Sequence, residues 1–195
     1  GAGPACSCGS GATALSAEIA KIGRTIHGGA PVTTPALPPL PDCGARVLAV
    51  GLDLVHVPGV VEQLAVPGSS FAEQAFTARE RREARRRAEE RRSHEAEHLA
   101  ARWAAKEAFV KAWSMAVNAV TGRTFPPILT LEKVDWRDIE VVTDRWGRPS
   151  VRLGGTIAEA VEASLGEGAR STGLWPVSLT HDGDWAAAIV LALAR

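Results

Sequence analysis

The chain has 195 residues, 46% of them hydrophobic, and its 22 basic and 22 acidic side chains give a formal net charge of zero. This length fits one domain with or without an appendage, and a neutral chain lacks the strong positive field typical of proteins that bind nucleic acid or a membrane surface. With only three cysteines, and no apolar run near the roughly 20 residues of a membrane-spanning helix, we expect a cytoplasmic protein that binds neither nucleic acid nor membrane.

The first 45 residues predict an N-terminal extension that precedes the folded domain of residues 46–195. A Gly-, Ala- and Ser-rich start favours disorder, helical apolar spacing over 13–27 indicates a short amphipathic helix, and five prolines over 30–44 indicate a semi-rigid linker. The extension also holds residue types that ligate zinc, namely Cys6, Cys8, His27 and Cys43. Their spacing matches no common zinc module, so we favour a flexible tether.

The folded domain is expected to begin with a strand and to continue with helices. The run "RVLAVGLDLVHV" over 46–57 is almost continuously apolar, which predicts a buried strand that ends at Pro58 and Gly59. The stretch over 71–120 favours helix with one or two breaks, and Thr77 followed by Glu80 fits a capping box.

The C-terminal part predicts short strands around one more helix. The segments "DIEVVTD" and "PSVRL" indicate two strands joined at a turn with Gly147, and "TIAEAVEASL" has helical spacing. The segment "WPVSLTHDGDWAAAIVLALA" over 175–194 indicates a hairpin with Asp-Gly at its turn. This order predicts an α+β fold in which a small antiparallel sheet wraps around one long helix.

Charged residues interrupt the apolar face of that long helix, in the segment "RWAAKEAFVKAW" over 102–113. On a helical wheel, Lys106 falls within an apolar stripe, whereas Glu107 and Lys111 lie on its flank, four residues apart. The stripe consists of Leu99, Trp103, Val110, Trp113 and Val117. One explanation is a simple surface ion pair, with Lys106 extending to solvent. The apolar neighbours instead favour a partner such as a metal ion or a phosphate.

Asp53 supplies a second acid, in the interior of the predicted apolar strand. An unpaired carboxylate is costly there, although a hydrogen-bonded aspartate at a strand end is the simpler alternative. If Asp53 and Glu107 converge, their oxygens with the nearby lysines suit Mg²⁺ carrying a phosphorylated substrate.

Four segments in a consistent order resemble the holo-acyl-carrier-protein synthase family, the trimeric branch of the 4′-phosphopantetheinyl transferases. They are "VGLDLV" (50–55), "RWAAKEAFVKAW" (102–113), "WGRP" (146–149) and "VSLTH" (177–181). The resemblance implies transfer of 4′-phosphopantetheine from coenzyme A to a serine of an acidic acyl carrier protein, with release of adenosine 3′,5′-bisphosphate, in fatty acid biosynthesis. It also implies a homotrimer with active sites between subunits.

The resemblance also implies roles for individual residues. Asp53 and Glu107 would bind Mg²⁺, and Glu107 and Lys111 would be catalytic, as acceptor of the serine proton and as stabiliser of the leaving phosphate. The implied coenzyme A contacts are Lys106, Lys111, Arg102, Gly147 and Pro149, with Lys106 on a phosphate oxygen or holding Glu107 in place. A non-catalytic relative that only docks a carrier protein is the alternative function.

Pro176 departs from the family pattern, because many relatives carry a histidine there. His181 is then the nearby imidazole, although we favour a histidine that is satisfied by its neighbours at a strand end. A hydrolase triad of Ser178, His181 and Asp184 is a weaker alternative, since residues of one hairpin need not converge.

Arginines dominate the segment between Arg79 and Arg92, which holds eight of them against four glutamates. A solvated helix face with i,i+4 ion pairs is the simplest explanation. Two functional alternatives are a clamp for the 3′-phosphate of coenzyme A and a dock for an acidic carrier protein. Nucleic acid is disfavoured, because no aromatic residues interleave with these charges.

Overall fold

The computed structural model describes residues 46–126, 128–130 and 133–195. The predicted extension, with its helix, linker and cysteines, lies outside the described residues, and the domain boundary at residue 46 stays a prediction. The described elements in chain order are β1 (Val47–His56), α2 (Val57–Ala65), α3 (Phe71–Ala75), α4 (Ala78–Arg91), α5 (Glu95–Thr121), the short 3₁₀ helix η2 (Trp136–Asp138), β2 (Ile139–Thr143), β3 (Pro149–Leu153), α6 (Gly155–Leu165), the short 3₁₀ helix η3 (Thr172–Leu174), β4 (Val177–Asp182) and β5 (Trp185–Leu193).

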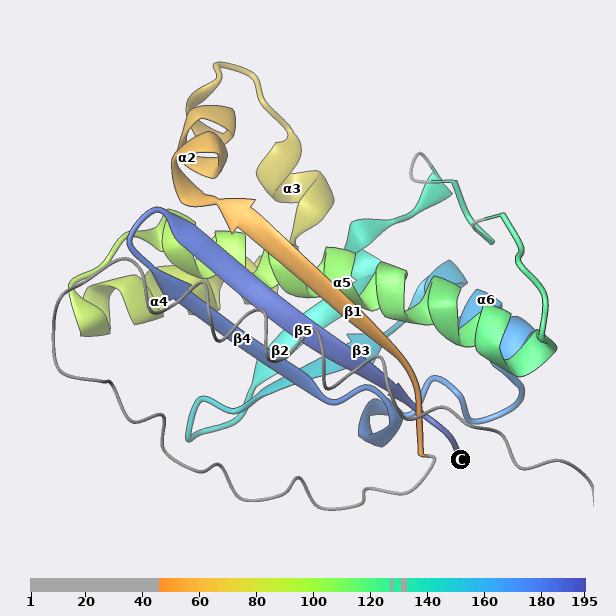
Figure 1. The fold of residues 1–195 in the computed structure, drawn as a ribbon. Helices are drawn as coiled ribbons and strands as arrows, with labels where there is room; N and C mark the ends of the chain where they lie inside the picture. The colour runs from red at the N-terminus through yellow and green to blue at the C-terminus, as the bar shows by residue number, and fades with distance from the viewer. Residues whose placement is uncertain (1–45, 127, 131–132) are drawn as a thin grey trace, which may run out of the picture. The chain divides into compact units, whose positions relative to one another are not determined.

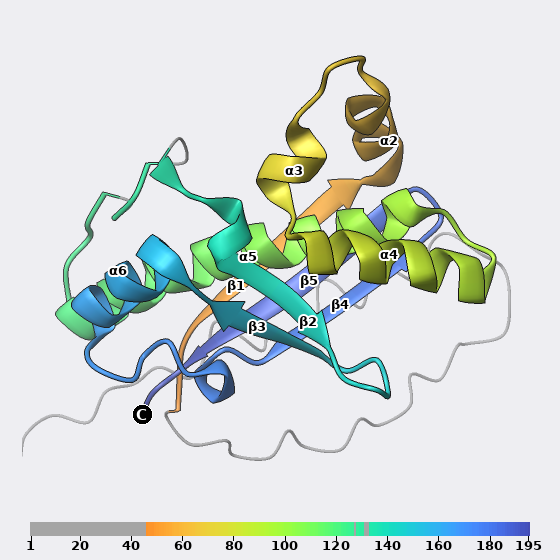
Figure 2. The same cartoon turned by 180° about the vertical axis from the view of Figure 1, so that it is seen from behind.

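Helix α5 forms the centre of this α+β fold, as predicted. Figures 1 and 2 show it between a three-stranded antiparallel sheet of order β1-β5-β4 and the antiparallel β2–β3 pair, with α6 beside its C-terminal half. Buried alanines let these elements approach the helix closely, namely Ala104, Ala105, Ala108, Ala112 and Ala116. Leu99, Trp113 and Val117 of the predicted stripe are buried as well.

Gly51 is the closest point of contact between β1 and α5. A Cβ atom at this position would lie 1.8 Å from the Ala108 carbonyl oxygen and 2.7 Å from the Ala112 nitrogen, both of which belong to the helix backbone. Backbone atoms inside a packed helix have no room to yield. Glycine at position 51 therefore allows β1 to pack directly on α5. This packing places Asp53, two positions later, against the helix.

The predicted full burial of the first strand is wrong for the described chain. Val50, Leu52 and Leu54 are 50%, 63% and 60% exposed, because they point away from α5 and nothing in the described chain covers them. Their neighbours across the β1–β5 ladder include Ile189, which is 40% exposed. An apolar sheet face of this kind is typical of an interface.

The local predictions are otherwise confirmed. Thr77 and Glu80 form the capping box of α4, with hydrogen bonds of 3.1 Å from Glu80 N to Thr77 Oγ1 and 2.8 Å from Thr77 N to Glu80 Oε2. Gly147 forms the β2–β3 turn with a φ of 86°, and Gly183 begins the β4–β5 turn with a φ of 54°. None of the described helices is long and apolar enough to cross a membrane.

Candidate active site

Asp53 and Lys111 form an ion pair between β1 and α5. Lys111 Nζ lies 2.6 Å from Asp53 Oδ1 and donates a second hydrogen bond of 3.3 Å to the Leu52 carbonyl oxygen. The Asp53 side chain is 8% exposed and that of Lys111 is 53% exposed. Among the described residues, the other Asp53 oxygen is buried without a hydrogen-bond partner. The aspartate is thus held in place, while the lysine head can turn towards a ligand at the surface.

Glu107 lies beside this pair, one helical turn before Lys111 on α5. Burial and the adjacent Asp53 carboxylate raise the pKa of Glu107, and Lys111 opposes them only in part. Two neighbouring carboxylates repel each other unless a proton or a cation lies between them. The structure therefore brings together the three residues singled out in the sequence, and their roles stay predictions.

The two carboxylates offer a small set of ligands for a metal ion. Within the described residues, no three His, Cys, Asp or Glu side chains are grouped as ligands. Mg²⁺ commonly takes only one or two carboxylates when water and phosphate oxygens fill its other positions. The unpartnered oxygen of Asp53 and the raised pKa of Glu107 both fit such an ion.

Lys106 does not belong to this group. It is fully buried, and its Nζ donates hydrogen bonds of 2.7 Å to the Ala75 carbonyl, 2.8 Å to the Trp136 carbonyl and 2.9 Å to Glu80 Oε2. These three acceptors use all three ammonium hydrogens. The prediction that Lys106 contacts a phosphate or holds Glu107 is therefore wrong, because its side chain enters the core and joins α5 to the capping box of α4.

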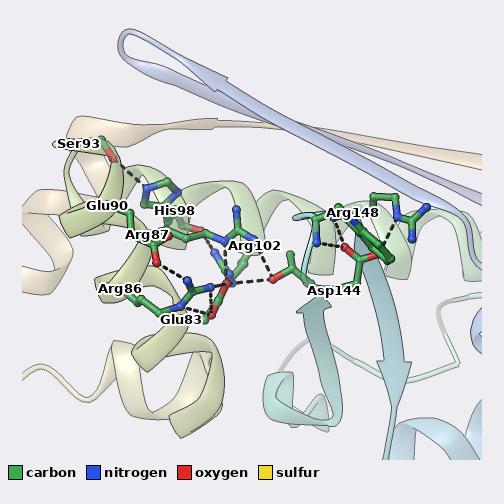
Figure 3. A network of polar contacts seen from close by, with 11 residues as sticks. Glu83, Arg86, Arg87, Glu90, Ser93, His98, Arg102, Asp144 and Arg148 are labelled. Carbon is green, nitrogen blue, oxygen red and sulfur yellow. Dashed lines mark hydrogen bonds and ion pairs between the residues drawn. The ribbon is translucent and has the colours of Figure 1, made fainter.

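A second site, which we call the arginine cavity, lies beside β4. Its volume is about 220 Å³, and it opens between α4, α5, β4 and the β2–β3 turn. The polar and turn residues that matter most here are Arg87, Arg91, Arg102, Thr143, Gly147 and His181. Figure 3 shows Arg87 of α4 and Arg102 of α5 close to one another, with His98 next to them.

Arg87 is held in the cavity by Glu83. Its Nε donates a 2.7 Å hydrogen bond to Glu83 Oε1 (Figure 3). Its Nη2 lies 3.3 Å from Thr143 Oγ1. Although partial burial raises the pKa of Glu83, hydrogen bonds from Arg86, Arg87 and Thr143 lower it to about 2. Glu83 is therefore ionised at neutral pH and fixes the direction of the Arg87 guanidinium.

Arg102 has donors to spare. Its Nη1 donates a 2.9 Å hydrogen bond to the His98 carbonyl, but Nε and Nη2 are buried without partners among the described residues, and the side chain is only 3% exposed. Burial lowers the pKa of Arg102, while Glu80 and Glu83 oppose the shift. A buried guanidinium with unused donors is costly unless an anion reaches it. The cavity therefore suits a phosphate group.

The β2–β3 turn contributes Gly147 to the lining of the cavity, and the implied contact of Gly147 with coenzyme A stays a prediction. A Cβ atom on Gly147 would lie 3.2 Å from the Arg87 guanidinium, and the φ of 86° itself favours glycine at this position. Pro149 starts β3 opposite Thr143, outside the lining of the cavity. Trp146, which precedes Gly147, is 65% exposed, and the Arg145 guanidinium lies 3.8 Å from its ring centroid.

His181 lines the arginine cavity instead of joining Asp53 and Glu107. Its Nδ1 lies 3.3 Å from Glu97 Oε2, as the expectation of a satisfied strand-end histidine requires. Ser178 is exposed and lies three positions before His181 in β4, so the two side chains point to opposite faces of the sheet. This geometry excludes the triad alternative.

The two sites lie on opposite sides of α5. Asp53 is paired with Ala188 of β5, and Ala188 is paired in turn with Leu179 of β4, so a whole strand separates the acidic pair from the cavity. On α5, Arg102 and Glu107 are five residues apart, which turns their side chains about 140° from each other. Each site therefore has its own opening.

The sequence did not single out Arg87, His98 or Thr143, which line the arginine cavity. Arg87 was one of eight similar arginines, and neither Thr143 nor His98 carries a motif. The spacing of His98, Arg102 and Lys106 by four residues could have placed them on one side of α5, but it could not say which of them meets a cavity.

Known proteins resemble most of this chain. The family model described as the 4′-phosphopantetheinyl transferase superfamily matches residues 49–190. A holo-[acyl-carrier-protein] synthase of Corynebacterium glutamicum strain R is 48% identical over 142 residues, which cover 73% of this chain and 95% of the relative. The enzyme of the same name from Mycobacterium tuberculosis strain H37Ra is 47% identical over 146 residues, with 74% and 95% covered.

Solved structures agree with these relatives. The "ACPS-CoA complex" of Chronobacterium ammoniagenes is 45% identical, with a TM-score of 0.60, and the alignment covers 75% of this chain and 98% of that one. An apo structure of the same name is 43% identical, with a TM-score of 0.61 and coverages of 75% and 96%. The family model and the relatives each match well over half of the sequence, so this chain belongs to the 4′-phosphopantetheinyl transferase superfamily.

Proposed function

We propose that this protein is a holo-acyl-carrier-protein synthase, which transfers 4′-phosphopantetheine from coenzyme A to a serine hydroxyl of an apo acyl carrier protein. The observation that carries the proposal is the meeting of Asp53, Glu107 and Lys111 in a chain 48% identical to an enzyme of that name. A buried aspartate, a glutamate of raised pKa and an exposed ammonium are groups that phosphoryl transfer can use.

In the proposed reaction, the serine oxygen attacks the β-phosphorus of coenzyme A. Glu107 accepts the serine proton, and its raised pKa makes it a stronger base than an ordinary glutamate. The bond from the β-phosphorus to the bridging oxygen breaks, and adenosine 3′,5′-bisphosphate leaves. Lys111 donates a hydrogen bond to the leaving phosphate, for which its exposed head would leave Asp53.

Asp53 and Glu107 are the residues that would hold Mg²⁺. The ion would supply positive charge to the pyrophosphate oxygens, which lowers the cost of the charge that develops during transfer. Asp53 would keep its place through the packing of β1 on α5 at Gly51, whichever cation its oxygens bind.

The arginine cavity suits the 3′-phosphate of coenzyme A, because Arg87, Arg91 and Arg102 surround it and Arg102 has unused donors. Within one chain, α5 separates this cavity from Asp53 and Glu107. A homotrimer with active sites between subunits removes the difficulty, since an adjacent copy would bring its own cavity to the β1 edge. The exposed apolar residues of β1 support such an interface.

The arginines of α4 divide between two faces, which supports both functions considered for them. Arg87 and Arg91 line the arginine cavity, whereas Arg81 and Arg85 line a separate groove between α2, α3, α4 and α5. The floor of that groove is apolar, with Leu64 and Leu99 among its residues. An acidic carrier protein would meet the basic rim of this groove while its apolar side chains fill the floor.

Mass spectrometry tests the proposed activity. The protein is incubated with coenzyme A, Mg²⁺ and an apo carrier protein, and the carrier is then weighed. We expect a gain of one phosphopantetheine per carrier, and no gain with several carriers would favour the alternative of a relative that docks carriers without modifying them. The presence of Asp53, Glu107 and Lys111 together favours the enzyme.

A single substitution tests the site itself. Glu107→Gln keeps the size of the side chain but removes both the base and a metal ligand, so transfer should fall by at least about 100-fold. The fold, measured by circular dichroism, should be unchanged. Turnover like that of the unsubstituted protein would overturn the role given to Glu107.

A further inference from the structure

Glu97 connects the start of α5 to the end of β4. Its Oε1 accepts a 3.3 Å hydrogen bond from the His94 backbone nitrogen, as part of the capping box of α5. Its Oε2 lies 3.3 Å from His181 Nδ1. The cap restrains the carboxylate, so one oxygen is available to hold the imidazole of a residue that lines the arginine cavity.

His98 restrains the same imidazole from another direction. The two rings meet edge to face, with centroids 5.0 Å apart and planes at 89°. His98 Nε2 is itself 2.9 Å from Ser93 Oγ. Burial and the neighbouring His181 lower the pKa of His98 to about 4, so the His98 ring is neutral at physiological pH. It therefore packs against the His181 ring as an uncharged group.

We propose that Glu97 is a positioning residue that holds His181 by Nδ1 and thereby turns its Nε2 towards the 3′-phosphate of coenzyme A in the arginine cavity. A histidine ring has two nitrogens, and when one of them is hydrogen-bonded to a carboxylate, the other is the one that can meet a ligand. With Nδ1 donating to Glu97, the protonated ring has one further N–H, on Nε2, which would donate to a phosphate oxygen beside the guanidinium groups of Arg87 and Arg102. The inference rests on the proposed function, since it assigns one part of coenzyme A to this cavity.

Steady-state kinetics with two co-substrates tests the role of Glu97. Coenzyme A and 3′-dephospho-coenzyme A differ only in the phosphate that His181 would bind. In Glu97→Ala we expect kcat/KM for coenzyme A to fall about 10-fold, chiefly through KM, while kcat/KM for 3′-dephospho-coenzyme A changes less than about 2-fold. Glu159→Ala is the control, because Glu159 is exposed on α6 and lines neither the arginine cavity nor the groove proposed for the carrier protein.

A double-mutant cycle separates positioning from a general loss of structure. In a His181→Ala background, Glu97→Ala should cause no further loss of preference for coenzyme A. Equal losses with both co-substrates, or the full effect of Glu97→Ala without His181, would overturn the proposal. If the unsubstituted protein transfers from neither co-substrate, the proposed function fails, and the tautomer measurement below then decides the inference about Glu97.

Nitrogen-15 NMR of the histidine rings in the full chain reads the geometry directly. The signals of the His181 ring are assigned by their disappearance in His181→Gln. We expect the neutral ring to carry its hydrogen on Nδ1 in the unsubstituted protein, and to lose this preference in Glu97→Ala. A neutral His181 ring that carries its single hydrogen on Nε2 in the unsubstituted protein would contradict the proposal, whether or not the protein transfers phosphopantetheine.

Discussion

Two lysines of α5 lie five residues apart and carry the same charge, but they should respond to substitution in opposite ways. Lys106 is fully buried with Glu80, whereas the side chain of Lys111 is 53% exposed beside Asp53. Lys106→Met removes three hydrogen bonds, leaves the Ala75 and Trp136 carbonyls without that donor, and leaves the Glu80 carboxylate buried without its cation. Breaking a buried ion pair by removing one partner costs about 3–5 kcal/mol.

That cost is a large fraction of the roughly 5–15 kcal/mol by which domains are stable, so Lys106→Met should unfold at a much lower urea concentration. Lys111→Met is the comparison, because only one partner of its pair is buried: the Lys111 side chain is 53% exposed and that of Asp53 is 8% exposed. It should lose less stability than Lys106→Met, and it should lose transfer. The stability of both variants is measured by tryptophan fluorescence in urea. The protein concentration is kept fixed, because association of copies of the chain changes the apparent stability.

A Lys106→Met variant as stable as the unsubstituted protein, with transfer abolished, would mean that Lys106 is a ligand of the substrate and not a link between α5 and α4. Glu80→Gln added to Lys106→Met offers a further check, because removing the orphaned charge should recover part of the lost stability.

Three further changes test other parts of the fold and site. Gly51→Ala would place a Cβ 1.8 Å from the Ala108 carbonyl oxygen, so we expect a protein that circular dichroism shows to be unfolded or to melt at a far lower temperature. Val50→Arg would put a charge on the exposed face of β1 and should leave a monomer in light scattering, where an intact trimer would refute the proposed interface. Asp53→Asn removes one of the charges that raise the pKa of Glu107, so the acid limb of kcat/KM in the residual activity should move to lower pH.

Gly173→Ala is the control for Gly51→Ala, because a Cβ at Gly173 would meet no atom within 4 Å and should leave the melting temperature nearly unchanged. For Asp53→Asn, the sign follows from the direction of the shift. A base of raised pKa loses its charge at a higher pH as the solution is acidified, so a limb that stays in place or moves to higher pH would contradict the coupling of the two acids.

Local features could be predicted from the sequence because neighbouring residues produce them. The capping box at Thr77 and Glu80, the turn at Gly147 and the hairpin at the C-terminus all depend on residues within a few positions of one another. The motif around Glu107, with Asp53, also indicated the acidic site, since charges in apolar segments need partners wherever the chain folds.

Only the tertiary structure decided what each charge meets. A helical wheel placed Lys106 within the apolar stripe of α5. It could not show that the Ala75 and Trp136 carbonyls and the Glu80 carboxylate accept hydrogen bonds from its ammonium group. Nor could it show that Arg102 opens on a cavity on the far side of α5 from Glu107. The sequence by itself indicated most of the helices and strands, and it singled out Asp53, Glu107 and Lys111. Contacts between residues distant in the chain decided that Lys106 is buried with Glu80 and that Lys111 is exposed beside Asp53, because burial and partners depend on what packs against each side of the helix.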